Sequence, residues 1–182
     1  MDLIKTPRLT IRGWQDSDLM PFAELCGDPH AMRYFPNTLS VSETQTLIDR
    51  ICESIVENGF GFWAAELSDT REFIGFIGIH KLDEAYHFAP GVEIGWRLKQ
   101  QFWGKGLAPE GAAAVLDYAF NQLNLDEVVA LTAVQNTPSQ RVMQKLGMID
   151  TGQNFNHPKL DSNHNLAEHV LYRISRKDFT QS

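Results

Sequence analysis

Two glycines, Gly104 and Gly106, flank Lys105 at the point where a predicted strand is followed by a predicted helix. Backbone N–H groups at the start of a helix have no partner within the helix, and the helix dipole favours a negative charge there. Glycine lets a ligand approach the backbone closely because it has no Cβ atom. A strand, a glycine loop and a helix start in this order therefore predict a site for a phosphate-bearing ligand.

The spacing of this loop excludes two familiar nucleotide-binding motifs. The dinucleotide fingerprint G-x-G-x-x-G needs glycine or alanine at position 109, which is Pro109 here. The P-loop needs serine or threonine after its lysine, and Gly106 follows Lys105 instead. No carboxylate cluster in the sequence indicates a magnesium site. The ligand is therefore expected to carry phosphate without being a dinucleotide or a nucleotide bound by a P-loop.

The spacing that fits is [Gln/Arg]-x-x-Gly-x-[Gly/Ala], at residues 101–106. An Asn-x-x-Ser segment at residues 136–139 and the run Lys-Leu-Gly-Met at 145–148 follow it. With these segments the chain resembles the GCN5-related N-acetyltransferases, the GNAT family, which bind acetyl-coenzyme A through this motif. Residues 6–12 and 93–96 look like the branch that includes the RimJ and RimL ribosomal-protein N-terminal acetyltransferases. The resemblance covers nearly the whole chain.

Composition fits one domain that spans residues 1–182. The formal net charge of −7 argues against nucleic acid as the main partner, because phosphate backbones need a basic surface, whereas it suits a cationic amine. No apolar run approaches the ~20 residues of a membrane helix, and the first residues lack a signal-peptide pattern. We therefore expect a cytoplasmic protein with no membrane partner, in which Cys26 and Cys52 stay reduced.

Hydrophobic periodicity predicts a mixed α/β domain. Strands are predicted at residues 8–12, 60–67, 73–82, 91–98, 127–134, 148–155 and 166–174. Helices are predicted at residues 19–25, 28–32, 41–58, 107–123 and 138–146. The helix at 107–123 acts as a crossover, so the strands on either side of it run parallel. The resemblance implies the GNAT fold, a mostly antiparallel twisted sheet of about seven strands flanked by helices, whose parallel pair splays apart to form the coenzyme slot.

The resemblance also implies how acetyl-coenzyme A is held. Backbone N–H groups of residues 102–108 bind the pyrophosphate, while Lys105 adds charge or is a solvated loop lysine. The pantetheine arm pairs with backbone groups around Trp96 and Leu98, where Gly95 marks a bulge or is a simple packing glycine. Trp103 is expected to pack beneath the loop. The expected coenzyme-binding residues are Trp96, Leu98, Gln101, Phe102, Trp103, Gly104, Lys105, Gly106, Leu107, Ala108, Asn136 and Ser139.

The chemistry that the resemblance implies is direct attack of an amine on the acetyl thioester. A base must take a proton from the amine, and Glu93 is the candidate, with an ion-paired strand carboxylate as the alternative. A backbone N–H near Trp96 polarises the thioester carbonyl. Many family members protonate the leaving thiolate with a tyrosine, but Met143 stands at that position, which leaves Ser139 or water. Asn136 bonds the coenzyme arm or only caps a helix.

The acceptor is expected to be a protein N-terminus or a small primary amine. A second hypothesis keeps the enzyme and makes the acceptor a metabolite or drug amine. An acyl-CoA-binding sensor or subunit with little catalysis is the alternative from another class. His157 and His169 are expected either to line the acceptor pocket or to be polar residues of a loop and a strand face. Their spacing does not suit a zinc site. Tyr34 and Phe35 are candidates for the acceptor wall. Strand edges near the C-terminus leave a homodimer open.

Overall fold

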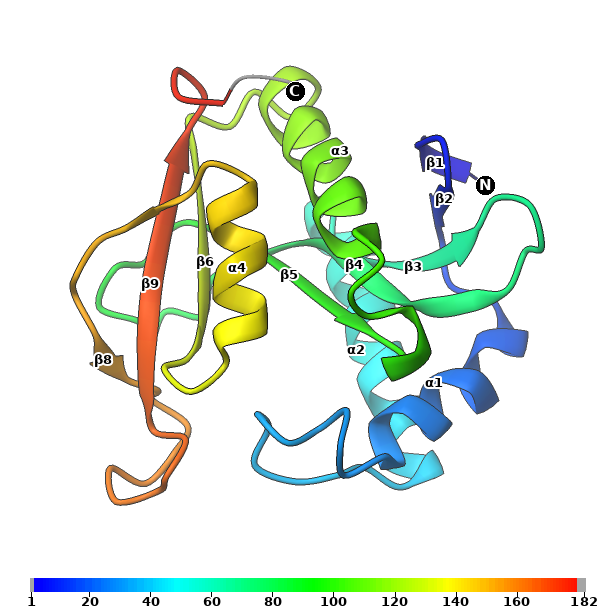
Figure 1. Cartoon of the computed structure of the whole chain (residues 1–182), viewed down its shortest axis with the longest axis horizontal. Coiled ribbons are helices and arrows are strands. Elements are labelled where there is room, and N and C mark those ends of the chain that lie inside the picture. The colour runs from blue at the N-terminus through cyan, green and yellow to red at the C-terminus, as the bar shows by residue number, and fades with distance from the viewer. Residues whose placement is uncertain (1, 180–182) are drawn as a thin grey trace.

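The structure, a computed structural model, describes residues 2–179, and within them one mixed sheet is flanked by helices (Figure 1). The helices are α1 (Leu19–Gly27), α2 (Val41–Asn58), α3 (Leu107–Asn121) and α4 (Thr137–Lys145), with 3-10 turns η1 (Asp16–Asp18) and η2 (Gln100–Phe102). The strands are β1 (Asp2–Lys5), β2 (Leu9–Arg12), β3 (Phe62–Leu67), β4 (Phe73–Lys81), β5 (Val92–Leu98), β6 (Glu127–Ala133), β7 (Ile149–Asp150), β8 (Phe155–Asn156) and β9 (Glu168–Ser175).

The sheet runs in the order β1-β2-β3-β4-β5-β6-β9-β7, and β8 also pairs with β9. Every pair is antiparallel except β5 with β6, so the expected mixed and mostly antiparallel sheet is confirmed. The described residues form nine strands rather than about seven. Residues 2–5 add β1, and the predicted strand at 148–155 is divided into β7 and β8. Gly152 lies between these two with a left-handed φ of 67°, which interrupts extended backbone.

The parallel pair separates almost as soon as it forms. Among the described residues, β5 and β6 pair at one position, Glu93 opposite Val129. Figure 1 shows β5 running away from β6 beyond this point, while β6 stays beside β9. The crossover helix α3 connects the two strands, as a parallel connection requires. The expected splayed pair is therefore present, and it opens beside Glu93.

The other edge of β5 is fully paired with β4 from Val92 to Leu98, without a register shift. The expected bulge is therefore absent from this pairing. Gly95 is a packing glycine, because a Cβ atom there would lie 3.0 Å from Cε1 of Phe62. Along a strand of an antiparallel pair, the backbone N–H and C=O groups of every second residue face the partner strand, and those of the residues between face away. Lys99 N donates to Ile74 O beside the end of β5, so the backbone groups of odd-numbered residues face β4. The backbone groups of the even-numbered residues of β5 therefore face the opening.

Side chains of β5 alternate between two layers, as predicted. Ile94 and Leu98 are buried in the larger core with residues of α3 and α4, and Trp96 packs against that core. Residues of α1, α2, β3 and β4 form a second core on the other face of the sheet, with Phe22 and Phe76 among its members. Glu93, Gly95 and Arg97 belong to this second face. In residues 2–179 no helix combines the length and apolar character that crossing a bilayer requires.

Local signals set the helix boundaries well in most places. The side chain of Ser40 accepts from Glu43 N in a capping box at the start of α2, and Gly59 ends the helix with a φ of 78°. The helix predicted at residues 28–32 is wrong, because the structure has only turns there. Asp28 is extended, with ψ of 113°, since a residue before proline is pushed out of the helical region.

Candidate active site

The glycine loop turns the chain from β5 into α3. Gly104 and Gly106 have φ of 72° and 77°, a left-handed backbone that residues with side chains rarely adopt. Gly106 is the N-cap of α3, and Glu110 N donates to Gly106 O at 3.2 Å. The N–H groups of Leu107 and Ala108 precede this first helical bond, so they are available to an anion. Their side chains lie against the core, where Leu107 is buried.

The turn η2 in front of the loop narrows the expected phosphate cradle. Phe102 N donates to Lys99 O and Trp103 N donates to Gln100 O, each at 3.0 Å. The prediction that N–H groups from residue 102 onward hold the pyrophosphate therefore does not hold for Phe102 and Trp103. The ring of Phe102 is buried in the core and supports the loop from below. Among the described residues, the N–H groups of residues 104–108 make no such bond, so this stretch is the candidate cradle.

Trp103 is tied to the end of β5. Its Nε1 donates to Leu98 O at 2.8 Å, and its ring lies 4.9 Å from the guanidinium of Arg33 and 5.8 Å from the ring of His30. Trp103 thus contacts the end of β5 and the segment after α1, and 36% of its surface is exposed. The contact also occupies the carbonyl of Leu98. The backbone left facing the splayed opening is therefore centred on Trp96.

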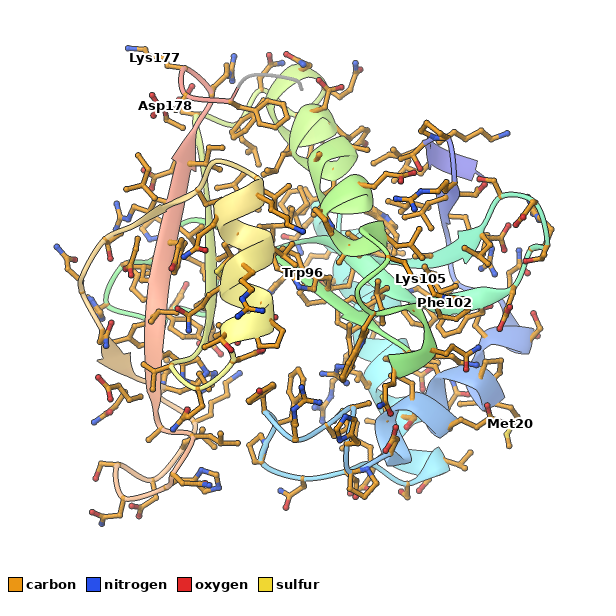
Figure 2. All side chains as sticks on the ribbon, in the orientation of Figure 1. Met20, Trp96, Phe102, Lys105, Lys177 and Asp178 are labelled. Carbon is orange, nitrogen blue, oxygen red and sulfur yellow. The ribbon has the colours of Figure 1, made fainter. Side chains whose placement is uncertain are left out.

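The two polar side chains of the loop motif, Lys105 and Gln101, are exposed. Lys105 is exposed, and its Nζ lies 5.5 Å above the ring of Phe102; Figure 2 shows both residues beside the start of α3. Gln101 is exposed and its Nε2 donates to Glu72 Oε1 at 3.0 Å, which connects η2 to the β3–β4 hairpin. Lys105 is free to contribute charge to a bound phosphate, whereas Gln101 acts on the loop through Glu72.

An arginine from the N-terminal segment also holds the loop. Arg8 Nη1 donates to Lys105 O at 2.8 Å, and Arg8 Nε donates to Glu110 Oε2 at 2.6 Å. Thr6 Oγ1 donates to the other carboxylate oxygen of Glu110 at 2.6 Å. The sequence of residues 6–12 by itself predicts a strand and resembles a family signature, but it does not predict a contact with the loop. Its contacts with the loop come from sequence separations near 100 residues, which no local pattern reports.

The central strand places Trp96 at the splayed opening. Figure 2 shows Trp96 beside α4, on the face of the sheet that carries the larger core. Its backbone N–H and C=O face away from β4, where β6 has already diverged. An extended ligand arm can pair with these groups as an additional strand would.

Glu93 lies at the point where the opening begins, and it has a partner. His80 Nε2 is 2.9 Å from Glu93 Oε2, and the two residues are directly opposite each other on β4 and β5. The Glu93 side chain is 13% exposed and that of His80 is 30% exposed. The His80 ring lies 4.7 Å from the ring of Phe62, which fixes its orientation. Glu93 is thus a shielded carboxylate with a histidine that reaches solvent.

The Asn-x-x-Ser segment forms the N-cap of α4. Asn136 Oδ1 accepts from Ser139 N at 3.3 Å, and Asn136 Nδ2 donates to Thr132 Oγ1 at 2.8 Å and to Ser139 Oγ at 3.1 Å. The amide of Asn136 is therefore engaged in the cap, which favours the structural interpretation of this residue. Ser139 Oγ accepts one of these bonds, and its own O–H has no acceptor among the described residues. That hydroxyl is available to a ligand.

Met143 takes no part in polar chemistry. Its side chain is buried in the larger core, with 2% of its surface exposed. The position at which a tyrosine was expected from the family pattern thus supplies no proton here.

A tyrosine and two histidines gather near Glu93 on the same side of the sheet. Tyr86 Oη is 2.8 Å from His157 Nε2, and the rings of His157 and His169 are 4.9 Å apart. The pKa of His157 is lowered to about 4 by burial, and the pKa of Tyr86 is raised by burial and by the charge of Glu93. His157 Nδ1 accepts from Lys159 N at 3.2 Å. The neutral imidazole therefore carries its proton on Nε2 and donates to Tyr86.

Two hollows lie outside this arrangement. One of about 460 Å³ is lined by residues of α1 and η2, including Glu24 and Gln101. The other, of about 440 Å³, is lined by residues 154–168 together with Gln135. Neither contains Glu93, Trp96 or the glycine loop. In residues 2–179 no group of three histidine, cysteine or carboxylate side chains is placed to hold a metal ion, and both cysteines are free.

Comparison with known proteins decides the family. The model of the acetyltransferase (GNAT) domain matches residues 8–149. The chain belongs to the GNAT acetyltransferase family. It is 30% identical over 154 residues to p20, an uncharacterised N-acetyltransferase of Bacillus licheniformis, covering 84% of this chain and 85% of that protein. The residues matched by the family model include the glycine loop, Glu93 and α4.

Solved structures agree with this assignment. A GNAT-family acetyltransferase from Bacillus anthracis superposes with a TM-score of 0.80 at 26% identity, over 96% of this chain and 98% of that one. A RimJ protein of Mycobacterium smegmatis, solved with CoA-disulfide, has a TM-score of 0.78 at 18% identity, over 96% of this chain and 85% of that one. The first likeness supports the family, and the second concerns the fold.

Proposed function

We propose that this GNAT-family N-acetyltransferase moves an acetyl group from acetyl-coenzyme A directly to a primary amine, and that the amine is a protein N-terminus or a small molecule. One observation carries the proposal. Strand β5 separates from β6 at Glu93, so a shielded carboxylate lies where the unpaired edge of β5 begins. That edge leads to the glycine loop and the start of α3. Together these features offer a site for the pyrophosphate, a site for the pantetheine arm and a proton acceptor.

The residues fit the coenzyme on their own geometry. The left-handed glycines at 104 and 106 remove side chains from the approach to the N–H groups of residues 104–108, which suit a pyrophosphate. The unpaired edge at Trp96 suits the amides of a pantetheine arm. When bound, acetyl-coenzyme A supplies an acetyl thioester. A backbone N–H of β5 near Trp96 polarises its carbonyl without having to reorganise.

Proton handling falls to Glu93 and Ser139. An α-amine has a reference pKa of about 7.7–8.0, so it is largely protonated at neutral pH and must lose a proton before it attacks. Glu93 accepts that proton directly or through water, and its bond to His80 leads toward solvent. The free O–H of Ser139 donates to the departing thiolate, since Met143 cannot.

The proposal leaves two classes of amine as candidates for the acceptor. A peptide N-terminus, the RimJ/RimL-type acceptor, is one candidate, suggested by the segments at residues 6–12 and 93–96. Spermidine N-acetyltransferase from Vibrio cholerae shares the fold at 20% identity, with a TM-score of 0.74, and its structure holds CoA and spermine. A small amine therefore remains the other acceptor to be measured.

The test is free-thiol release from acetyl-coenzyme A over a panel of acceptors. Peptides that begin with alanine or serine, polyamines, aminoglycosides and amino acids are supplied separately, with acetylation of the acceptor verified by mass spectrometry. Release with at least one amine supports the proposal. Tight coenzyme binding without release for any acceptor would contradict it and favour an acyl-CoA-binding sensor.

A further inference from the structure

Arg97 is a cation without an anion. It lies on β5, on the same face as Glu93, with its Cζ 4.0 Å from the ring centroid of Phe35 and 5.4 Å from that of Phe76. Its Nη1 donates to Cys26 Sγ at 3.4 Å, whereas its Nε is buried and has no hydrogen-bond partner. Among the described residues, no carboxylate is within ion-pair distance of it. Burial lowers the pKa of Arg97, which is the sign of a charge that the protein does not compensate.

Arg12, which is buried, shows how this chain compensates the charge of a guanidinium when it can. Arg12 is 3% exposed, and it binds Asp18 through Nη1 at 2.7 Å and Nη2 at 2.9 Å. Its Nε donates to Glu66 Oε2 at 2.6 Å. Arg12 thus has a carboxylate on each usable edge of its guanidinium. Because a buried ion is costly unless it is paired, the lack of any such partner at Arg97 needs a separate explanation.

The neighbours of Arg97 do not supply the missing anion. Glu93 is paired with His80, and Glu24 is 3.7 Å from Lys99. Cys26 is fully buried, and burial raises the pKa of its thiol, so it remains neutral near pH 7. The side edge of the guanidinium, formed by Nε and Nη2, is the edge that binds a carboxylate through two parallel bonds, and it has no partner in residues 2–179.

Arg97 and the phosphate cradle lie on opposite faces of the sheet, so the phosphates of the coenzyme do not supply the missing anion. The phosphate cradle lies at the start of α3, which packs on the larger core, whereas Arg97 lies on the opposite face with Glu93. Glu93 and Arg97 are four residues apart on one strand, about 13 Å between Cα atoms. Gly95 lies between them and contributes no side chain, so the ring of Phe62 forms the floor there. A negative group, an apolar floor and a positive group thus follow one another along β5.

We propose that Arg97 binds a carboxylate of the acceptor, so that the acceptor is a small amine that also carries a carboxylate, as an amino acid does. This inference rests on the proposed function, whose acceptor it names by class. The carboxylate pairs with Nε and Nη2 of Arg97, and Glu93, about 13 Å away between Cα atoms, receives the proton of the amine through water. Phe35, which is 37% exposed and belongs to the segment between α1 and α2, stacks on the face of the guanidinium and leaves its side edge to the carboxylate.

Matched pairs of acceptors test this inference in the wild-type enzyme. Tyrosine and tyramine, histidine and histamine, and tryptophan and tryptamine differ by one carboxylate. We expect the amino acid of a pair to have at least about tenfold higher kcat/KM, with the difference mainly in KM, as a hydrogen bond to a charged group suggests. The same amino acid should raise the melting temperature of the protein without coenzyme, and its amine should not.

Arg97→Gln and Arg97→Lys examine the residue itself. Arg97→Gln should remove the preference for the amino acid and its thermal shift while coenzyme A still binds, and Arg97→Lys should restore only part of both because lysine lacks the fork. Equal use of both members of every pair would overturn the inference, as would a preference for peptides over all free amino acids. If Arg97→Gln does not fold, the wild-type pairs decide alone. Absence of thiol release with every amine would instead overturn the proposed function.

Discussion

His80 Nε2 lies 2.9 Å from Glu93 Oε2, across two strands whose register places these residues directly opposite each other. The pair lies where β5 and β6 part, and only 13% of the Glu93 side chain is exposed. In the proposed function, the carboxylate takes a proton at the opening and passes it toward solvent through His80. Both residues come from the central, fully paired part of the sheet, so their separation is held by the backbone.

Replacing Glu93 with glutamine should lower turnover by roughly 10²-fold near neutral pH, since general base catalysis contributes on this scale. The loss should shrink at higher pH, where the amine deprotonates without help. Coenzyme A affinity should not change. The measurement is a pH–rate profile of both enzymes with the best acceptor, and Glu127→Gln on β6, an exposed carboxylate, is the matched control. A profile identical to that of wild type would exclude Glu93 as the base.

Replacing Arg8 with glutamine should weaken coenzyme A binding roughly three- to tenfold, because the bond to Lys105 O and the ion pair with Glu110 are both lost. Calorimetric titration measures the affinity. Binding of S-acetylpantetheine, which has no pyrophosphate, should hardly change. Arg176→Gln, remote from the loop and bound to Leu125 O, is the control. Equal weakening for both ligands would show that Arg8 does not act through the phosphate loop.

Gly104 offers a test of the phosphate cradle. A Cβ atom at Gly104 would meet no other atom within 4 Å, so the strain of a substitution comes from its φ of 72° and not from crowding within the chain. A β-branched residue in left-handed backbone costs about 1–2 kcal/mol, whereas asparagine tolerates this conformation better. Gly104→Val should therefore weaken coenzyme A binding more than Gly104→Asn does. The opposite order would argue against a loop held in this backbone.

The buried His157 should make the protein sensitive to mild acid. Its pKa is about 4 in the folded protein against 6.5 in the unfolded chain, so the unfolded chain binds more protons between these values. Stability that is present above pH 6.5 is therefore lost as the pH falls toward 4. We expect the melting temperature of wild type to fall more steeply than that of His157→Gln over this range. Parallel curves for the two proteins would mean that His157 is not held neutral.

Much of this architecture follows from short-range patterns. The capping box at Ser40, the apolar stripe of α3 and the two glycines at 104 and 106 each set a boundary through neighbouring residues, and each boundary is found in the structure. The helix predicted at residues 28–32 failed because its few residues offer one hydrogen bond of helical type, from Met32 N to Asp28 O, after an extended residue.

The site was predicted less completely, because much of it is made by long-range contacts. The sequence offered the loop and Glu93 as candidates, but it gave no sign of the contact between Arg8 and Lys105 or of the pairing of Tyr86 with His157. Each of these joins residues that are far apart along the chain. Asn136 also shows that one residue type at one spacing can serve either a cap or a ligand, and only the positions of its partners decide.

The most direct test of the account is where coenzyme A binds, measured by hydrogen–deuterium exchange with and without the coenzyme. We expect slower exchange in peptides that cover residues 94–98 of β5 and 104–108 of the loop and α3. The two hollows identified elsewhere, lined by residues of α1 and η2 or by residues 154–168, should change little. Protection confined to either hollow, with no change at the glycine loop, would contradict the account.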